Sequence, residues 1–171
     1  MTPDALGTVI RVPTSADATS IAHVHVQSWR ETYTGMVPEE FFGETALQRR
    51  IGFWTRILGG ELPERLRLAQ RGGEVIGFGF AGPAIGADVD KGQLPARPLH
   101  LYSLYLLAAH HGRGVGRALL ESVIGSEPAQ LWVARDNVRA RDFYERQGFA
   151  ADGAEYADPA IAGLVEIRMV R

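Results

Sequence analysis

Residues 101 to 120 read LYSLYLLAAHHGRGVGRALL, and this stretch decides the fold. Its first seven residues are apolar or aromatic apart from Ser103, which predicts a buried strand. Three glycines follow at positions 112, 114 and 116, and an apolar run at helical spacing begins at Val115. The first turn of a helix has backbone N–H groups without intrahelical acceptors, and the helix dipole favours negative charge there. The stretch therefore predicts an anion site, with Arg113 and Arg117 adding positive charge at its rim.

The spacing of these glycines excludes two common phosphate loops. A Walker A loop needs Lys and then Ser or Thr after its last glycine, and a dinucleotide fingerprint needs G-x-G-x-x-G, whereas this loop reads G-x-G-x-G. A literal G-x-G-x-x-G lies at residues 77–82, inside a strand-like run that ends at Pro83. We interpret that segment as a glycine-rich strand, where glycine permits a bulge or the close approach of another chain segment.

Residues 111–116, HGRGVG, resemble the loop of the GNAT superfamily of acyl-CoA-dependent N-acyltransferases. In that family a strand leads through (Gln or Arg)-x-x-Gly-x-(Gly or Ala) into a helix, and the turn holds the pyrophosphate of coenzyme A. His111 departs from the usual Gln or Arg, but the backbone cradle does not depend on that side chain. Residues 137–149 also match the second family pattern, N-x-x-A-x-x-(F/L)-Y-x-x-x-G-F, at every specified position.

The resemblance implies acetyl-CoA as cosubstrate and assigns the residues that bind it. By this resemblance the cofactor site comprises Leu104, Tyr105, Leu106, His111, Gly112, Arg113, Gly114, Val115, Gly116, Arg117, Ala118, Asn137 and Tyr144. The backbone of residues 104–106 would hold the pantetheine arm, and the N–H of Leu106 is the candidate oxyanion donor. Asn137 would contact the pantetheine arm or fix its loop, or it would only cap the following helix.

Tyr144 resembles the family's tyrosine near the thioester sulfur and is the candidate catalytic residue. A phenol with an ordinary pKa of about 10 protonates a thiolate with a pKa of about 8.5 only with help from geometry or environment. The alternative is that Tyr144 packs under its helix and only hydrogen-bonds the cofactor.

The acceptor side is less defined, with candidates at Trp29, Glu31, Tyr33, His100 and Tyr102. Relatives that acetylate protein N-termini often carry a glutamate five residues before the asparagine, where this chain has Trp132. Other relatives place an acid early in the long strand, where this chain has His100; an isolated histidine beside Pro98 is otherwise a surface residue. Glu31 and water are the alternative proton acceptors.

We therefore expect the acetyl group to pass directly from acetyl-CoA to a primary amine of a small molecule. This preference rests on Trp132 and on the lack of an acidic run for basic tails. A peptide or protein Nα-acetyltransferase and a non-catalytic acyl-CoA-binding sensor are the alternatives.

The amino-acid composition limits the classes of protein, partner and cofactor that fit this chain. The 171 residues are 46% hydrophobic and 22% charged, with a net charge of −2 and no cysteine. These values predict a soluble, cytoplasmic protein without disulfides, thiolate metal sites or a nucleic-acid partner, and we expect no metal cofactor. The longest apolar runs are too short for a membrane span. A homodimer through the last strand is an expectation from analogy with the family.

The pattern along the chain predicts one GNAT-type domain over residues 1–171, of the α/β (α+β) class, with a mixed, mostly antiparallel central sheet flanked by about four helices. His23 and His25 fall on different faces of the first helix, as surface or lightly packed residues. Residues 82–98 are expected to form a long flexible loop. Strands are expected at 8–12, 66–70, 74–81, 101–107, 130–134 and 164–170, and helices from about 17 to 33, 44 to 58, 115 to 125 and 137 to 147.

Overall fold

The computed structural model of the chain describes residues 7–35, 37–84, 86 and 88–171. The described residues form two compact units, one within residues 1–80 and 103–125 and the other within residues 81–102 and 126–171. The strands of the chain are hydrogen-bonded in the order β1-β2-β3-β4-β5-β7-β6, and β4 pairs with β5 in parallel. The pairs β1–β2, β2–β3, β5–β7 and β6–β7 are antiparallel. The predicted mixed, mostly antiparallel sheet with four α-helices is thus confirmed for the described residues.

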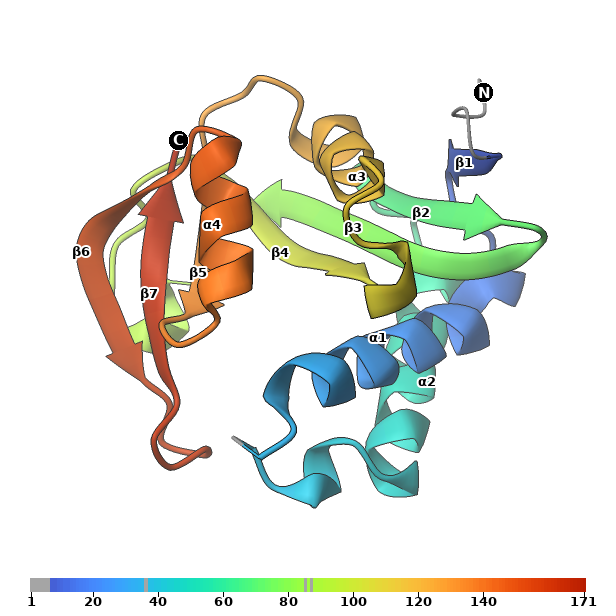
Figure 1. Cartoon of the computed structure of the whole chain (residues 1–171), viewed down its shortest axis with the longest axis horizontal. Helices are drawn as coiled ribbons and strands as arrows, with labels where there is room; N and C mark the ends of the chain where they lie inside the picture. Colours follow the sequence, from blue (N-terminus) through green and yellow to red (C-terminus); the bar gives the residue numbers. More distant parts are fainter. Residues whose placement is uncertain (1–6, 36, 85, 87) are drawn as a thin grey trace. The chain divides into compact units, whose positions relative to one another are not determined.

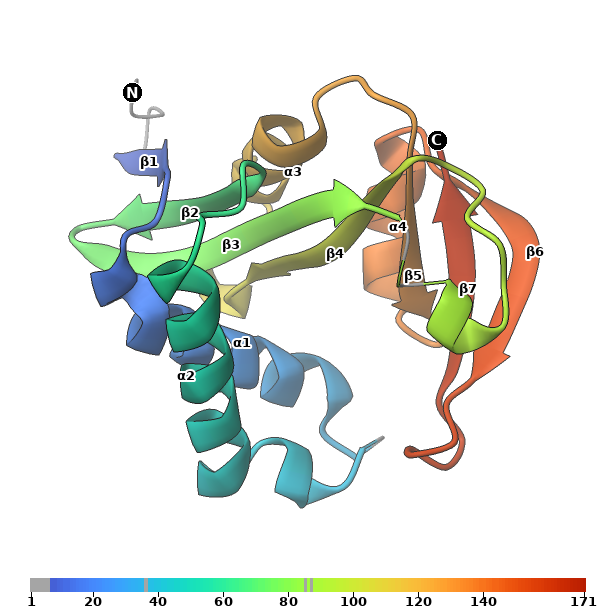
Figure 2. The ribbon, with the colours of Figure 1, turned by 180° about the vertical axis from the view of Figure 1, so that it is seen from behind.

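The first unit is a strand layer with helices on both faces. Helices α1 and α2 cover one face of its strands and α3 covers the other (Figures 1 and 2). Strands β3 and β4 continue from this unit into the second. Its elements are β1 (Thr8–Arg11), α1 (Ala18–Tyr33), α2 (Glu44–Gly59), β2 (Leu66–Arg71), most of β3 (Glu74–Pro83), the end of β4 (Leu99–Leu106) and α3 (Val115–Ile124).

The core of this unit forms because α1 and α2 place their apolar stripes against the strands. Ile21 and Trp54, from the two helices, are almost fully buried with Phe78 from β3. The two strands expected at 66–70 and 74–81 form a hairpin, and Gly72 and Gly73 turn it with φ angles of 58° and 90° that favour glycine.

A buried ion pair fixes the start of α1. Asp17 accepts two hydrogen bonds from the Arg11 guanidinium, at 2.6 and 2.8 Å, and also bonds the backbone N–H of Thr14 at 2.7 Å. These hydrogen bonds, led by the one from Arg11, lower the pKa of Asp17 to about 2. Asp17 therefore ties the start of α1 to β1.

Gly77 allows β4 to pass close to β3. A Cβ atom at this position would lie 2.7 Å from the carbonyl oxygen of Tyr105 and 2.9 Å from a methyl group of Leu106. The predicted close approach at the glycine-rich strand is confirmed here.

The second unit contains a strand that the sequence pattern does not predict. Its elements are β5 (Ala129–Ala134), α4 (Val138–Arg146), β6 (Ala150–Ala157) and β7 (Val165–Val170), together with the start of β4. Strand β6 is missing from the prediction because nearly all of it is exposed, so it has no alternating apolar pattern. It also occupies the edge of the sheet, and β7 lies between β5 and β6. The expectation that the last strand offers a free edge for a second copy is therefore wrong.

Among residues 82–98, the described segment 88–98 is held by hydrogen bonds, so the expected long flexible loop is not found there. This segment contains the short 3₁₀ helix η3 (Val89–Lys91), and α4 and η3 lie on opposite faces of β5 and β7 (Figures 1 and 2). Asp88 is fully buried and accepts hydrogen bonds from Gln130, from Trp132 at 3.0 Å and from Arg168 at 3.1 Å. The alternation in β7 predicts an exposed Arg168, but this pairing buries it.

Candidate acetyl-CoA and acceptor sites

The glycine loop enters α3 with the geometry of an anion cradle. Gly112 and Gly114 have φ angles of 73° and 81°, in the left-handed region that favours glycine. Gly114 is the N-cap of α3, and its carbonyl accepts the N–H of Ala118 at 3.0 Å. The N–H groups of the preceding residues in the first turn have no intrahelical acceptor. A Cβ atom at either glycine would meet nothing within 4 Å, so open space lies in front of the loop.

Two side chains fix this loop within the first unit. His111 Nε2 lies 2.7 Å from the carbonyl oxygen of Leu106, so Nε2 carries the proton and donates. Glu31 of α1 accepts the backbone N–H of Ala108 at 2.8 Å with one oxygen and Gln27 at 3.1 Å with the other. His111, which stands where the family motif usually has Gln or Arg, thus anchors the loop to β4. Glu31, a predicted acceptor residue, holds the connection that follows β4.

The end of β4 lies over this unit's core. Leu104 and Leu106 pack against the buried cluster that contains Leu119 of α3. The ladder between β4 and β5 is formed by Leu99↔Ala129 and His100↔Gln130, the first two residues of β4. Residues 104–106, which the resemblance assigns to pantetheine, follow that paired segment.

An aromatic cluster joins α1 to β4. The Trp29 indole donates to the Tyr105 hydroxyl at 2.9 Å, and the His25 ring stacks on Tyr105 at 4.8 Å between centroids. Tyr33 lies 5.1 Å and Phe41 6.4 Å from the Trp29 ring. The predicted acceptor residues Trp29 and Tyr33 are therefore brought together.

His25 differs from the surface or lightly packed residue predicted. Besides its contact with Tyr105, it lies against the rings of Trp54 and Phe78, and its Nδ1 accepts the Trp54 indole at 3.4 Å. Burial, with a smaller contribution from the Arg50 charge, lowers its pKa to about 3. His25 is therefore neutral at physiological pH, while His23 is exposed as predicted.

Arg50 of α2 is not among the predicted site residues, yet its guanidinium lies 5.1 Å above the Trp29 ring. Its position is three residues after Leu47 and four before Trp54, on the apolar stripe of α2. An arginine at an otherwise apolar position of an amphipathic helix is the sequence feature by which Arg50 could have been predicted as a functional residue.

The second motif lies in the other unit. Asn137 caps α4 by accepting the N–H of Ala140 at 3.1 Å, so a contact with pantetheine would come from its Nδ2. Tyr144 is buried, with its ring between those of Phe143 at 5.3 Å and Phe149 at 5.8 Å. Gly148, with φ of 88°, ends the helix as predicted.

His100 is buried rather than at the surface. The side chain of Gln130 is oriented by the N–H groups of Ala96 and Arg97, which donate to its Oε1 at 2.6 and 2.7 Å. Its amide nitrogen therefore faces His100 Nδ1 at 3.3 Å, and Nδ1 accepts. Burial lowers the pKa of His100 to about 4, so the ring is neutral with its proton on Nε2. The Tyr102 ring is tilted against that of His100 at 4.6 Å between centroids, and its hydroxyl donates to the Pro83 carbonyl at 2.5 Å.

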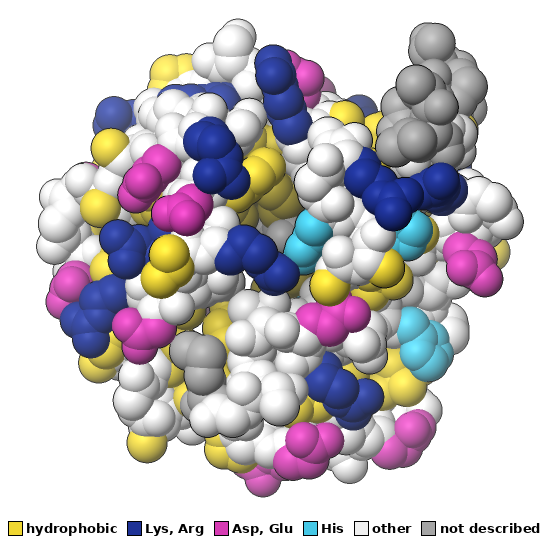
Figure 3. Space-filling model, viewed as in Figure 1, with side chains coloured by type: hydrophobic (Ala, Val, Ile, Leu, Met, Phe, Trp, Pro, Cys, Tyr) yellow, Lys and Arg dark blue, Asp and Glu magenta, His cyan; other side chains and the backbone are white. Residues whose placement is uncertain are grey.

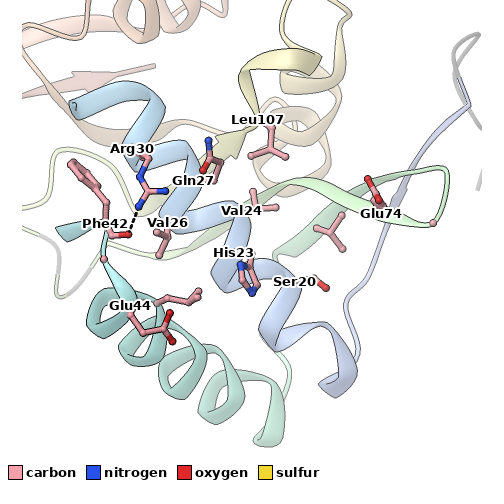
Figure 4. A pocket seen from close by; sticks show the side chains of 14 residues that line it. Ser20, His23, Val24, Val26, Gln27, Arg30, Phe42, Glu44, Glu74 and Leu107 are labelled. Atoms are coloured by element: carbon pink, nitrogen blue, oxygen red, sulfur yellow. Dashed lines mark hydrogen bonds between the residues drawn. The ribbon is translucent and has the colours of Figure 1, made fainter. Parts of the chain in front are cut away.

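A cavity of about 660 Å³ in the first unit is lined by residues of α1, the start of α2, the turn between β2 and β3, and Leu107. Figure 4 shows His23 between Glu44 and Glu74, with Arg30 donating to the carbonyl oxygen of Phe42 at 2.8 Å. The predicted site residues are not among the side chains that line it. We therefore separate this cavity from the predicted cofactor and acceptor residues.

Charge on the molecular surface is mixed. Figure 3 shows basic and acidic side chains interspersed over one face. Across the described residues, no three His, Asp or Glu side chains gather in a way that could hold a metal ion. Within the same residues, no helix has the length and apolar character needed to cross a membrane.

The geometry agrees with comparisons to known proteins. The family model for the acetyltransferase (GNAT) family matches residues 24–149. A probable N-acetyltransferase of Mycobacterium tuberculosis is 28% identical over 165 residues, which cover 91% of this chain and 87% of the relative. The crystal structure of the PaiA N-acetyltransferase of Thermoplasma acidophilum, in complex with coenzyme A, has a TM-score of 0.69 and 20% identity, covering 96% of this chain and 98% of that one. The chain belongs to the GNAT family of acetyltransferases and is an N-acetyltransferase.

Proposed function

We propose that this N-acetyltransferase uses acetyl-CoA to acetylate the primary amine of a small molecule. The observation that carries the proposal is the loop at Gly112 and Gly114, whose left-handed glycines lead into the first turn of α3. The unpaired N–H groups of that turn and the dipole of α3 suit a pyrophosphate. Arg113 and Arg117, both exposed, add positive charge.

In the proposed reaction the acceptor nitrogen attacks the thioester carbonyl, a C–N bond forms and the C–S bond breaks. The backbone N–H of Leu106 stabilises the oxyanion, and the phenol of Tyr144 gives its proton to the leaving thiolate. The acceptor ammonium first loses one proton to water, and the proton that the nitrogen loses as the amide forms passes through water to the tyrosinate, which restores the phenol of Tyr144. Water is preferred because Glu31 holds the Ala108 N–H and His100 Nδ1 faces the Gln130 amide.

The small-molecule preference is supported by Trp132. At the position where protein Nα-acetyltransferases often carry glutamate, this side chain donates to Asp88 at 3.0 Å. A carboxylate base is therefore not supplied from this position of β5.

The cofactor assignment is tested by thermal unfolding with millimolar acetyl-CoA, CoA, ATP or NAD. A ligand at 100 times its Kd adds about 2.7 kcal/mol to the free energy of unfolding. We expect stabilisation by the two CoA species, and stabilisation by ATP or NAD instead would contradict the proposal.

Turnover is tested with a panel of primary amines, measuring the free thiol that CoA release produces. Tyr144→Phe should lose turnover while acetyl-CoA still stabilises it. Phe143→Tyr on the wild-type background is the matched control for ring substitutions on α4. Unchanged turnover in Tyr144→Phe removes the proton-donor role, and acetylation of peptides but no small amine favours the Nα-acetyltransferase alternative.

A further inference from the structure

Arg50 of α2 is a half-buried cation with no ionic partner among the described residues. The ion pairs of the structure involve other side chains, and Arg50 Nε is buried with no hydrogen-bond partner in the described part of the chain. Burial lowers the pKa of its guanidinium, and the nearby Tyr105 hydroxyl acts in the opposite direction. A guanidinium nevertheless stays protonated in proteins, so a positive charge is held here without a counter-charge.

The surroundings of this charge are aromatic. The guanidinium lies 5.1 Å above the Trp29 ring, whose other aromatic contacts include Tyr33 and Phe41. The cation–π contact offsets part of the cost of desolvation but satisfies none of the guanidinium N–H groups. His25, the other titratable neighbour, is neutral at physiological pH and supplies no negative charge.

A ligand that suits this environment carries a planar anion, to pair with the Arg50 guanidinium, beside an apolar group, to contact the aromatic rings. A carboxylate accepts two parallel hydrogen bonds from a guanidinium, which a lysine or an amide side chain does not reproduce. We propose that Arg50 binds the carboxylate of the acceptor, so that the substrates are amino carboxylates with an apolar body. This inference rests on the proposed function, because it names the class of amine that the same enzyme acetylates.

The rings of the cluster hold Arg50 in position. Trp29 is fixed by its hydrogen bond to the Tyr105 hydroxyl, 2.9 Å long. Tyr105 belongs to the segment 104–106 that the proposed function gives to the pantetheine arm, and it packs in the same unit as Arg50. A carboxylate bound at Arg50 therefore contacts the same aromatic cluster that touches β4.

The test compares matched acceptors that differ only in the carboxylate. L-phenylalanine and L-leucine are assayed against L-phenylalaninamide and L-leucinamide with wild type, Arg50→Gln and Arg50→Lys. Arg49→Gln, at the exposed neighbouring arginine of the same helix, is the control. We expect Arg50→Gln to lower kcat/KM for the acids by roughly 10- to 100-fold, as for hydrogen bonds between charged groups. Turnover of the amides should change little, and Arg50→Lys should recover only part of the loss.

A binding measurement covers the case in which neither acceptor of a pair is acetylated. The Trp29 indole N–H resonance, assigned with Trp29→Phe, is followed while CoA-bound protein is titrated with L-phenylalanine or its amide. A saturable shift with the acid alone, absent in Arg50→Gln, supports the inference. No saturable shift with any acid, or an equal loss for acids and amides in Arg50→Gln, overturns it.

The two proposals fail in different ways. Loss of stabilisation by both CoA species in wild type contradicts the proposed function whatever Arg50 does. Normal CoA binding and amine turnover with no discrimination by Arg50 contradicts only the carboxylate site. If Arg50→Gln weakens CoA binding itself, the guanidinium serves the cofactor and the inference is wrong.

Discussion

Replacing Asp88 with Asn should destabilise the second unit by removing a fully buried charge. Asp88 has no exposed surface and accepts hydrogen bonds from Gln130, Trp132 and Arg168. Asparagine keeps the size of the side chain but replaces one acceptor oxygen with a donor group. At least one of the three donors then loses its partner, and Arg168 loses a counter-charge while keeping Asp152 at 2.7 Å.

The magnitude follows from these contacts. Removing one partner of a buried ion pair costs about 3–5 kcal/mol, and the remaining Arg168–Asp152 pair places this case at the lower end. We therefore expect a loss of about 3 kcal/mol in the free energy of unfolding. For a chain of this length that is a fall in Tm of roughly 6–12 °C. The control, Asp90→Asn, changes an exposed carboxylate of the same loop and should stay within about 0.5 kcal/mol.

Thermal and urea unfolding followed by circular dichroism measure the global effect, and hydrogen exchange locates it. The N–H groups of Ala96 and Arg97 bond to Gln130, which Asp88 orients, so both should exchange faster in Asp88→Asn. The N–H of Asp17 in the first unit should keep its protection. A loss below about 1 kcal/mol, or unchanged exchange at Ala96 and Arg97, would refute the reasoning that this buried carboxylate holds the loop.

Other substitutions test the remaining steps. Gly77→Ala places a Cβ atom 2.7 Å from a backbone carbonyl oxygen of β4, so thermal unfolding should show a loss of about 1–3 kcal/mol. Gly52→Ala in α2, where a Cβ atom meets nothing within 4 Å, should instead gain about 1 kcal/mol. Burial lowers the pKa of His100 from 6.5 to about 4, so as pH falls the unfolded chain takes up this proton first. Wild type should therefore lose about 2 kcal/mol more than His100→Asn between pH 7.5 and pH 5 in urea titrations, and equal losses would contradict the assignment. Gly114→Ala, at φ of 81°, should abolish stabilisation by acetyl-CoA at a folding cost of about 1–2 kcal/mol, and retained stabilisation would remove the loop from cofactor binding.

The elements that the sequence predicts are those specified by local chemistry. The Gly72–Gly73 turn, the cap at Asn137 and the stop at Gly148 each depend on residues within one or two turns of the chain. The same holds for the loop before α3, where the spacing of the glycines in the sequence predicts the loop whose Gly112 and Gly114 adopt the left-handed conformation. Apolar periodicity then identifies α2 and α3, because their buried positions recur at helical intervals.

The elements that the sequence does not predict depend on distant partners. Strand β6 lacks an alternating pattern because it is an edge strand with little buried surface. In the sequence, Asp88 resembles any exposed acidic residue of a loop. Its burial depends on pairing with Arg168, eighty positions away. His100 reads as a surface histidine for the same reason, since Gln130 reaches it from the neighbouring strand.

The sequence offers His100, Glu31 and water as proton acceptors, and the structure shows how the two side chains are engaged. A side chain removes a proton only through a free lone pair; neutral His100 has a single ring lone pair, whereas the Glu31 carboxylate has about four lone-pair sites. Glu31 uses its two oxygens for Ala108 and Gln27, and His100 Nδ1 faces the Gln130 amide while Nε2 holds the proton. We propose that the acceptor amine loses its proton to solvent, because the lone pair of His100 is engaged and Glu31 is held by the Ala108 N–H and Gln27. The pKa of the amine then sets how much of it is reactive at a given pH.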